Sequence, residues 1–187
     1  MTDLMNRPHP DCPADCPGTA ERGVDRQEPG TGERLNRLRA AVLGANDGIV
    51  STAAVVVGVA GATSDQTTIA MSGLAAVIGG AVSMALGEYV SVSSQRDSER
   101  AMGLAKEMQV NPWSAAIASF LSFLLGAALP FATALLAPAS WRIAAIFVLT
   151  LVALALTGAL SAKLGEAPVA RSMARIVVGG TMALAAT

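Results

Sequence analysis

The chain has 187 residues, of which 52% are hydrophobic, and its mean hydropathy is +0.51. Charged residues make up 14%, well below the quarter that is usual in soluble domains, so the composition indicates an integral membrane protein. The net charge is −1, and the sequence has no basic stripe with interleaved aromatic residues. These features argue against nucleic acid as a partner and leave the lipid bilayer as the expected environment.

Residues 1–34 differ in composition from the rest and predict a disordered, cytosolic N-terminal tail. They are rich in Pro, Gly and charged residues, and they lack the apolar core of a signal peptide. The tail contains His9, Cys12 and Cys16, whose side chains are potential ligands for a soft metal. Their spacing matches no standard zinc framework, so we expect reduced thiols on a plain tail, with accessory metal binding as the alternative.

Residues 35–187 predict an all-α membrane domain with five transmembrane helices. A bilayer core of about 30 Å requires about 20 apolar residues per helix. The predicted spans are residues 40–62, 69–94, 112–137, 141–163 and 168–187.

The fifth span contains two arginines, Arg171 and Arg175, in its first two turns. The remaining residues, 176–187, form a helix of only about 18 Å, which is too short to cross a bilayer alone. Either the arginines reach the lipid headgroups or the helix continues beyond Thr187, and we expect the second.

Basic residues concentrate in alternate connections, which predicts that the N-terminus is cytosolic. The 63–68 connection has no Lys or Arg, and the third-to-fourth connection has only Arg142. Connections on the other side carry Arg34, Arg37, Arg39, Arg96, Arg100, Lys106 and Lys163. The Ala-, Gly- and Arg-rich composition indicates a bacterial plasma membrane.

Asp47, in "GANDGIV", lies about two turns into the first span. A carboxylate at the bilayer centre costs about 2.5–3.5 kcal/mol, so it needs a reason to be there. It is either an interfacial or helix-capping aspartate, hydrogen-bonded to the backbone near the beginning of the helix, or a carboxylate that lines an aqueous path. Gly44, Gly48 and Ser51 run beside it at helical spacing, and small residues allow helices to approach closely. We therefore expect this face to contact another helix or a second copy of the chain.

The second span places Met84 and Glu88 four residues apart, on one face of a helix. A carboxylate attracts divalent cations generally, whereas a thioether prefers softer transition-metal ions. Together with Asp47, the two side chains form a ligand set suited to Fe²⁺ or Mn²⁺. The alternative for Met84 is a side chain that only fills the core.

Two long segments carry a resemblance to a known family: "LRAAVLGANDGIVSTAAVVVGVAGA" and "GGAVSMALGEYVSVSSQRDSERA". They closely resemble the vacuolar iron transporter family, and "NPWSAAIASFLSFLLGAALP" is similar to a later span of it. The resemblance implies a five-helix homodimer with a path between protomers. It also implies export of cytosolic Fe²⁺, often with Mn²⁺, in exchange for protons. Asp47, Met84 and Glu88 would then line the path and take the ion as transported substrate, with no permanently bound cofactor.

One connection departs from the family pattern. Typical members insert a long, glutamate-rich metal-binding domain between the second and third spans, where this chain has only "QRDSERAMGLAKEMQV", residues 95–110. In this respect it resembles the shorter nodulin-21-like branch. Glu99 and Glu107 remain as weak accessory candidates that gather cations, with plain solvated charges as the alternative.

Three other functions compete with proton-coupled export as interpretations of the sequence. A Mn²⁺-selective exporter would use the same oxygen and sulfur ligands. A non-transporting membrane scaffold would use the small-residue faces only to assemble helices. The sequence has no HExxH or GxSxG motif and no histidine within the spans, so an intramembrane enzyme is not expected.

Overall fold

The computed structural model of the chain describes residues 31–165 and 168–186, apart from the side chains of Glu107 and Ser172. Most of the predicted N-terminal tail therefore lies outside the described residues, as do His9, Cys12 and Cys16. Tail disorder and accessory metal binding both stay predictions.

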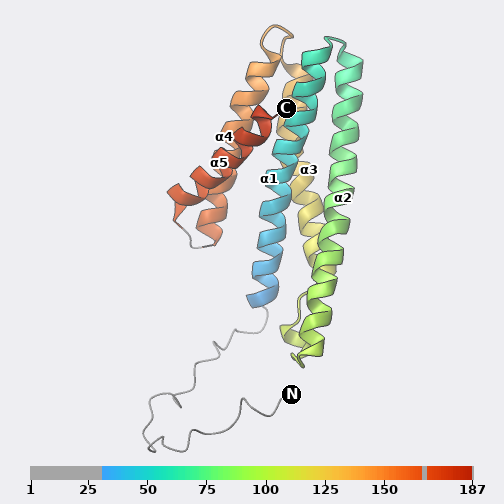
Figure 1. Cartoon of the computed structure of the whole chain (residues 1–187), viewed down its shortest axis with the longest axis vertical. Coiled ribbons are helices and arrows are strands. Elements are labelled where there is room, and N and C mark those ends of the chain that lie inside the picture. Colours follow the sequence, from blue (N-terminus) through green and yellow to red (C-terminus); the bar gives the residue numbers. More distant parts are fainter. Residues whose placement is uncertain (1–30, 166–167, 187) are drawn as a thin grey trace, which may run out of the picture.

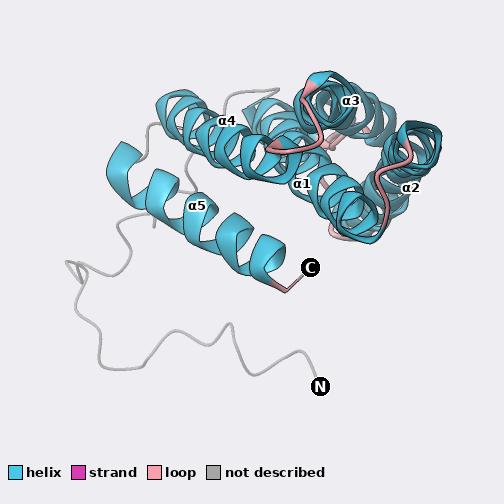
Figure 2. Cartoon of the chain, turned by 90° about the horizontal axis from the view of Figure 1, so that it is seen from above, coloured by secondary structure: helices cyan, strands magenta, loops and turns pink. Residues whose placement is uncertain are grey.

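The described chain is helical throughout and contains no strand, which confirms the predicted all-α fold. Its elements are α1 (Thr31–Ala62), α2 (Gln66–Ala101), the short 3₁₀ helix η1 (Lys106–Met108), α3 (Pro112–Leu136), α4 (Arg142–Leu164) and α5 (Val169–Ala185). The beginning of α1 lies at the same end of the molecule as η1, and the α1–α2 and α3–α4 turns lie at the other end (Figure 1). Seen from above, α1 lies between α2 and α3 on one side and α4 and α5 on the other (Figure 2).

Four helices, α1 to α4, are long and apolar enough to cross a membrane. Helix α5 has 17 residues, or about 26 Å, slightly less than a bilayer core of about 30 Å. Helices α1 and α2 are longer than their predicted spans. Helix α1 already begins at Thr31, so residues 31–34 are helical, and the 36 residues of α2 extend over about 54 Å.

Polar caps fix where α2 and α3 begin. The Asp65 carboxylate accepts hydrogen bonds from the Thr68 hydroxyl at 2.6 Å and the Thr68 N–H at 2.7 Å. These bonds hold the pKa of Asp65, in the turn before α2, below its usual value. The Asn111 side chain likewise accepts from the Trp113 N–H at 3.0 Å, and Pro112 follows at the first helical position.

Helices α1 and α3 approach each other backbone to backbone. A Cβ atom added at Gly44 would lie 2.5 Å from the backbone oxygen of Ser119, and one at Gly48 would overlap that of Phe123. From the other side, a Cβ at Gly126 would overlap the backbone oxygen of Ala45. This confirms that Gly44 and Gly48 contact another helix, which is α3.

A buried arginine connects three helices by hydrogen bonds at the end of the bundle opposite η1. Arg142 is 7% exposed, and its guanidinium donates to the side-chain oxygen of Gln66 at 2.5 Å and to the backbone oxygen of Ala137 at 3.3 Å. The Gln66 amide in turn donates to the backbone oxygen of Leu135 at 3.1 Å. Arg142 therefore joins α2, α3 and α4 and is not a free loop charge.

We expect Gly48→Ala to lower the thermal stability of the purified protein, because the new methyl group must push α3 away from α1. Overpacking of this kind costs about 1–3 kcal/mol. Gly61→Ala is the matched control on the same helix, since a Cβ there meets nothing within 4 Å. Equal melting temperatures for the two variants in detergent would contradict the close α1–α3 contact.

Candidate functional site

A groove of about 470 Å³ lies between α1 and α2. Helix α1 contributes a stripe with one residue per turn: Arg39, Leu43, Asp47, Ser51 and Val55. Helix α2 contributes Ala76, Gly80, Ser83, Met84, Gly87, Glu88 and Ser91. The structure thus brings Asp47, Met84 and Glu88 into one groove, although they come from two helices and lie up to 41 positions apart in the sequence.

Glu88 is the buried acid of this groove. Its side chain is only 4% exposed, and its Oε2 atom accepts a hydrogen bond from Nη2 of Arg39 at 3.1 Å. Its Oε1 atom is also buried and has no hydrogen-bond partner among the described residues. A buried carboxylate with an unpartnered oxygen is costly in the absence of a ligand, so this atom retains an unused capacity to accept a cation or a hydrogen bond.

Asp47 is half-buried and lies in the middle of α1, which begins 16 residues earlier, at Thr31. Its carboxylate makes no hydrogen bond with any described residue. Only its backbone oxygen is engaged, by the Ser51 hydroxyl at 2.6 Å. The alternative of a helix-capping aspartate is therefore wrong, and the side chain is free to act within the groove.

Met84 combines the two environments expected from the sequence, that of a possible ligand and that of a core side chain. It lines the groove and also packs against the buried cluster of Ala81, Phe123 and Ala127. A cluster contact on one side and a groove surface on the other leave the thioether able to contact a ligand while the core fixes its position.

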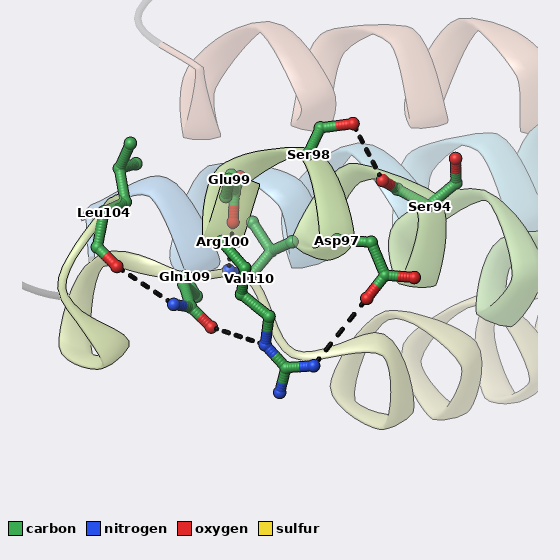
Figure 3. Close-up of polar contacts among 8 residues, drawn as sticks. All are labelled: Ser94, Asp97, Ser98, Glu99, Arg100, Leu104, Gln109 and Val110. Carbon is green, nitrogen blue, oxygen red and sulfur yellow. Dashed lines mark hydrogen bonds and ion pairs between the residues drawn. The ribbon is translucent and has the colours of Figure 1, made fainter. Parts of the chain in front are cut away.

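Glu99, by contrast, is 9% exposed and lies outside the groove, at the cytosolic end predicted for α2. Both of its oxygens accept hydrogen bonds, from the Gln95 amide at 2.9 Å and the Val110 N–H at 2.9 Å. Figure 3 shows Glu99 and Val110 where the connection folds back, with Gln109 between Arg100 and the backbone oxygen of Leu104. These contacts favour a structural role for Glu99. The side chain of Glu107 lies outside the described residues.

No group of three or more His, Cys, Asp or Glu side chains that could hold a metal ion is found in the described part of one chain. The groove offers two carboxylates, one thioether and several serine hydroxyls. Several of these are hard oxygen ligands and one is a soft sulfur ligand, which together suit a first-row divalent ion. A second copy of the chain would double the number of these ligands.

The role of Arg39 was missed at the sequence level, where this residue only indicated orientation. Stepping back from Asp47 by four residues reaches Leu43 and then Arg39, so the helical periodicity already placed all three on one stripe. What the sequence did not supply was the contact with Glu88, which is 49 residues away.

The sequence profile of the VIT family matches residues 38–110 and 99–187. Vacuolar iron transporter homolog 1 of Arabidopsis thaliana is 45% identical over 163 residues, or 83% of this chain and 82% of that protein. Vacuolar iron transporter homolog 5 of Oryza sativa subsp. japonica is 44% identical over 163 residues, which cover 82% of this chain and 78% of that protein. No solved structure matches the chain.

Arg39 and Glu88 differ in exposure, so we expect that replacing one or the other lowers the stability of the protein by different amounts. Arg39→Gln leaves a carboxylate that is 4% exposed without its cation, and stability should fall by up to about 3 kcal/mol. Glu88→Gln leaves an arginine that is 52% exposed and free to turn outward, so the loss should be smaller. Thermal unfolding in detergent measures both, and a larger loss for Glu88→Gln would contradict this account.

Proposed function

The chain belongs to the VIT family, and on that premise we propose that it exports Fe²⁺ or Mn²⁺ from the cytosol across a membrane in exchange for protons. The observation that carries the proposal is the groove between α1 and α2. It holds Asp47, Met84 and Glu88 on two helices long enough to cross a bilayer. Ionisable side chains within membrane-spanning helices commonly mark ion pathways.

The ligand chemistry supports a transition-metal ion as substrate. The Asp47 carboxylate and the unpartnered Oε1 atom of Glu88 replace part of the water shell of the ion, and the Met84 thioether favours a softer ion over Mg²⁺ or Ca²⁺. The relatives are named as vacuolar iron transporter homologs, which favours Fe²⁺. Mn²⁺ accepts the same ligand set, so selective Mn²⁺ export is the alternative.

Proton coupling follows from the same carboxylates. Metal binding requires them to be ionised, so protons that arrive from the opposite side compete with the ion and release it. One set of side chains then accounts for both ion binding and exchange. We further propose that the chain works as a homodimer, because one chain supplies few ligands and a second copy would present Asp47, Met84 and Glu88 again.

The distribution of basic residues supports a cytosolic N-terminus, and the Ala-, Gly- and Arg-rich composition is the basis for proposing a bacterial plasma membrane. Arg34 and Arg37 near the beginning of α1, Arg96 and Arg100 of α2 and Lys106 of η1 gather at one end of the bundle (Figure 1). At the opposite end, Arg142 is the only arginine among the described residues, and it is buried and hydrogen-bonded within the protein. The positive end is expected to face the cytosol.

Transport into proteoliposomes with an imposed pH gradient tests the proposal. We expect wild-type protein to take up Fe²⁺, supplied under reducing conditions, or Mn²⁺, and competition between the two ions to give the preference. Asp47→Asn and Glu88→Gln should each lower uptake at least about 10–100-fold, since even outer-shell residues of metal sites cost that much. A folded wild type that moves neither ion would refute the proposal, and unchanged uptake by Asp47→Asn would favour a scaffold.

The Glu99→Gln variant tests whether Glu99 has a structural role or gathers cations as an accessory acid. The substitution removes one charge from the same helix as Glu88 but keeps an acceptor for the Val110 N–H. If Glu99 is structural, the uptake rate should stay within about twofold of wild type, because no groove ligand is lost. Weaker uptake at low ion concentration, with an unchanged maximal rate, would instead support the accessory role.

A further inference from the structure

A second groove, of about 460 Å³, lies on the other side of α1, between that helix, the end of α4 and α5. Its walls are apolar over much of their area, with Leu38 and Val42 from α1 and Ile176 from α5. Two arginines, Arg39 and Arg175, also line it. It shares only Arg39 and Leu43 with the groove that contains Asp47 and Glu88.

The charge in this second groove is one-sided. Among the described residues, no acidic side chain lines it. Arg175 is exposed and forms no hydrogen bond or ion pair with any described residue. Arg39 is 52% exposed and bonds through its Nη2 atom to Glu88 and Asn36, which leaves other guanidinium donors unused. The Arg39 charge is balanced by Glu88, so Arg175 is the uncompensated cation of this groove, and the two guanidinium groups together retain free donors for an anion.

We propose that this groove binds the phosphate headgroup of an anionic phospholipid, with an acyl chain along its apolar wall. Basic pockets between membrane helices on the cytoplasmic side recognise such headgroups, and the planar fork of arginine matches phosphate oxygens. A lipid fits better than free phosphate because Leu38, Val42 and Ile176 offer an apolar surface that an acyl chain covers and free phosphate does not. The lipid site does not depend on the proposed transport activity.

Arg39 gives the lipid site a connection to the first groove. The guanidinium that would contact the headgroup is the one that pairs with Glu88 at 3.1 Å. A phosphate bound in the second groove would therefore offer Arg39 a second anion, in a groove that Glu88 does not line.

Lipid binding to the purified full-length chain tests the proposal without any transport measurement. Phosphatidylglycerol is added to delipidated protein in neutral detergent, and native mass spectrometry and thermal unfolding report binding. We expect one retained phosphatidylglycerol per chain and a higher melting temperature. Phosphatidylcholine with the same acyl chains and inorganic phosphate at the same concentration should give neither effect.

Substitutions then locate the site. Arg175→Gln should weaken phosphatidylglycerol binding about fivefold, the equivalent of about 1 kcal/mol for one basic residue near a lipid headgroup. Arg175→Lys should lose less phosphatidylglycerol affinity, because it keeps the positive charge and loses only the planar guanidinium group. Arg37→Gln is the matched control, since Arg37 is exposed at the same end of the bundle and does not line the groove.

Three results would overturn the proposal. Equal stabilisation by phosphatidylcholine would show that the headgroup charge is not recognised, and equal stabilisation by inorganic phosphate would show that no lipid is needed. Binding by Arg175→Gln at wild-type strength, or an equal loss in Arg37→Gln, would show that the attraction is diffuse and not centred on this groove.

Discussion

The ion pair between Arg39 and Glu88 is the contact on which the candidate site depends. A carboxylate that is 4% exposed on a membrane-spanning helix is tolerated only with a compensating charge, and Arg39 supplies that charge from the facing helix. The pair leaves the Oε1 atom of Glu88 without a described partner. The same contact therefore stabilises the acid and keeps part of it available to a cation.

The ion pair is possible because α1 uses its faces for different purposes. Its glycine face, with Gly44 and Gly48, packs against α3 at backbone distance and fixes the position of α1. The stripe from Arg39 to Val55 is thereby directed toward α2, where it forms the first groove. A bulkier residue on the glycine face would move α1 and shift Asp47 relative to Glu88.

Much of the fold and part of the candidate site could be predicted from the sequence, because membrane composition and helical periodicity are local properties. Hydropathy gave the helices, and spacing by four placed Met84 beside Glu88 and the small residues beside Asp47. The contacts between distant segments could not be predicted. Nothing local to Glu99 shows that its oxygens bond to Gln95 and Val110, and nothing near Arg39 shows its pairing with Glu88.

Charge balance gives a physical reason to favour an ion between two copies of the chain. With both carboxylates ionised, Asp47 and Glu88 contribute −2 to each groove and Arg39 contributes +1, which leaves −1 per chain. Under the proposed function, a single groove would neutralise a divalent ion only if Arg39 left Glu88, and the buried carboxylate would then lack its partner whenever the ion departed. Two facing grooves supply −2 with both ion pairs intact. The second arrangement would leave both ion pairs undisturbed during the proposed transport, and it agrees with the small number of ligands on one chain.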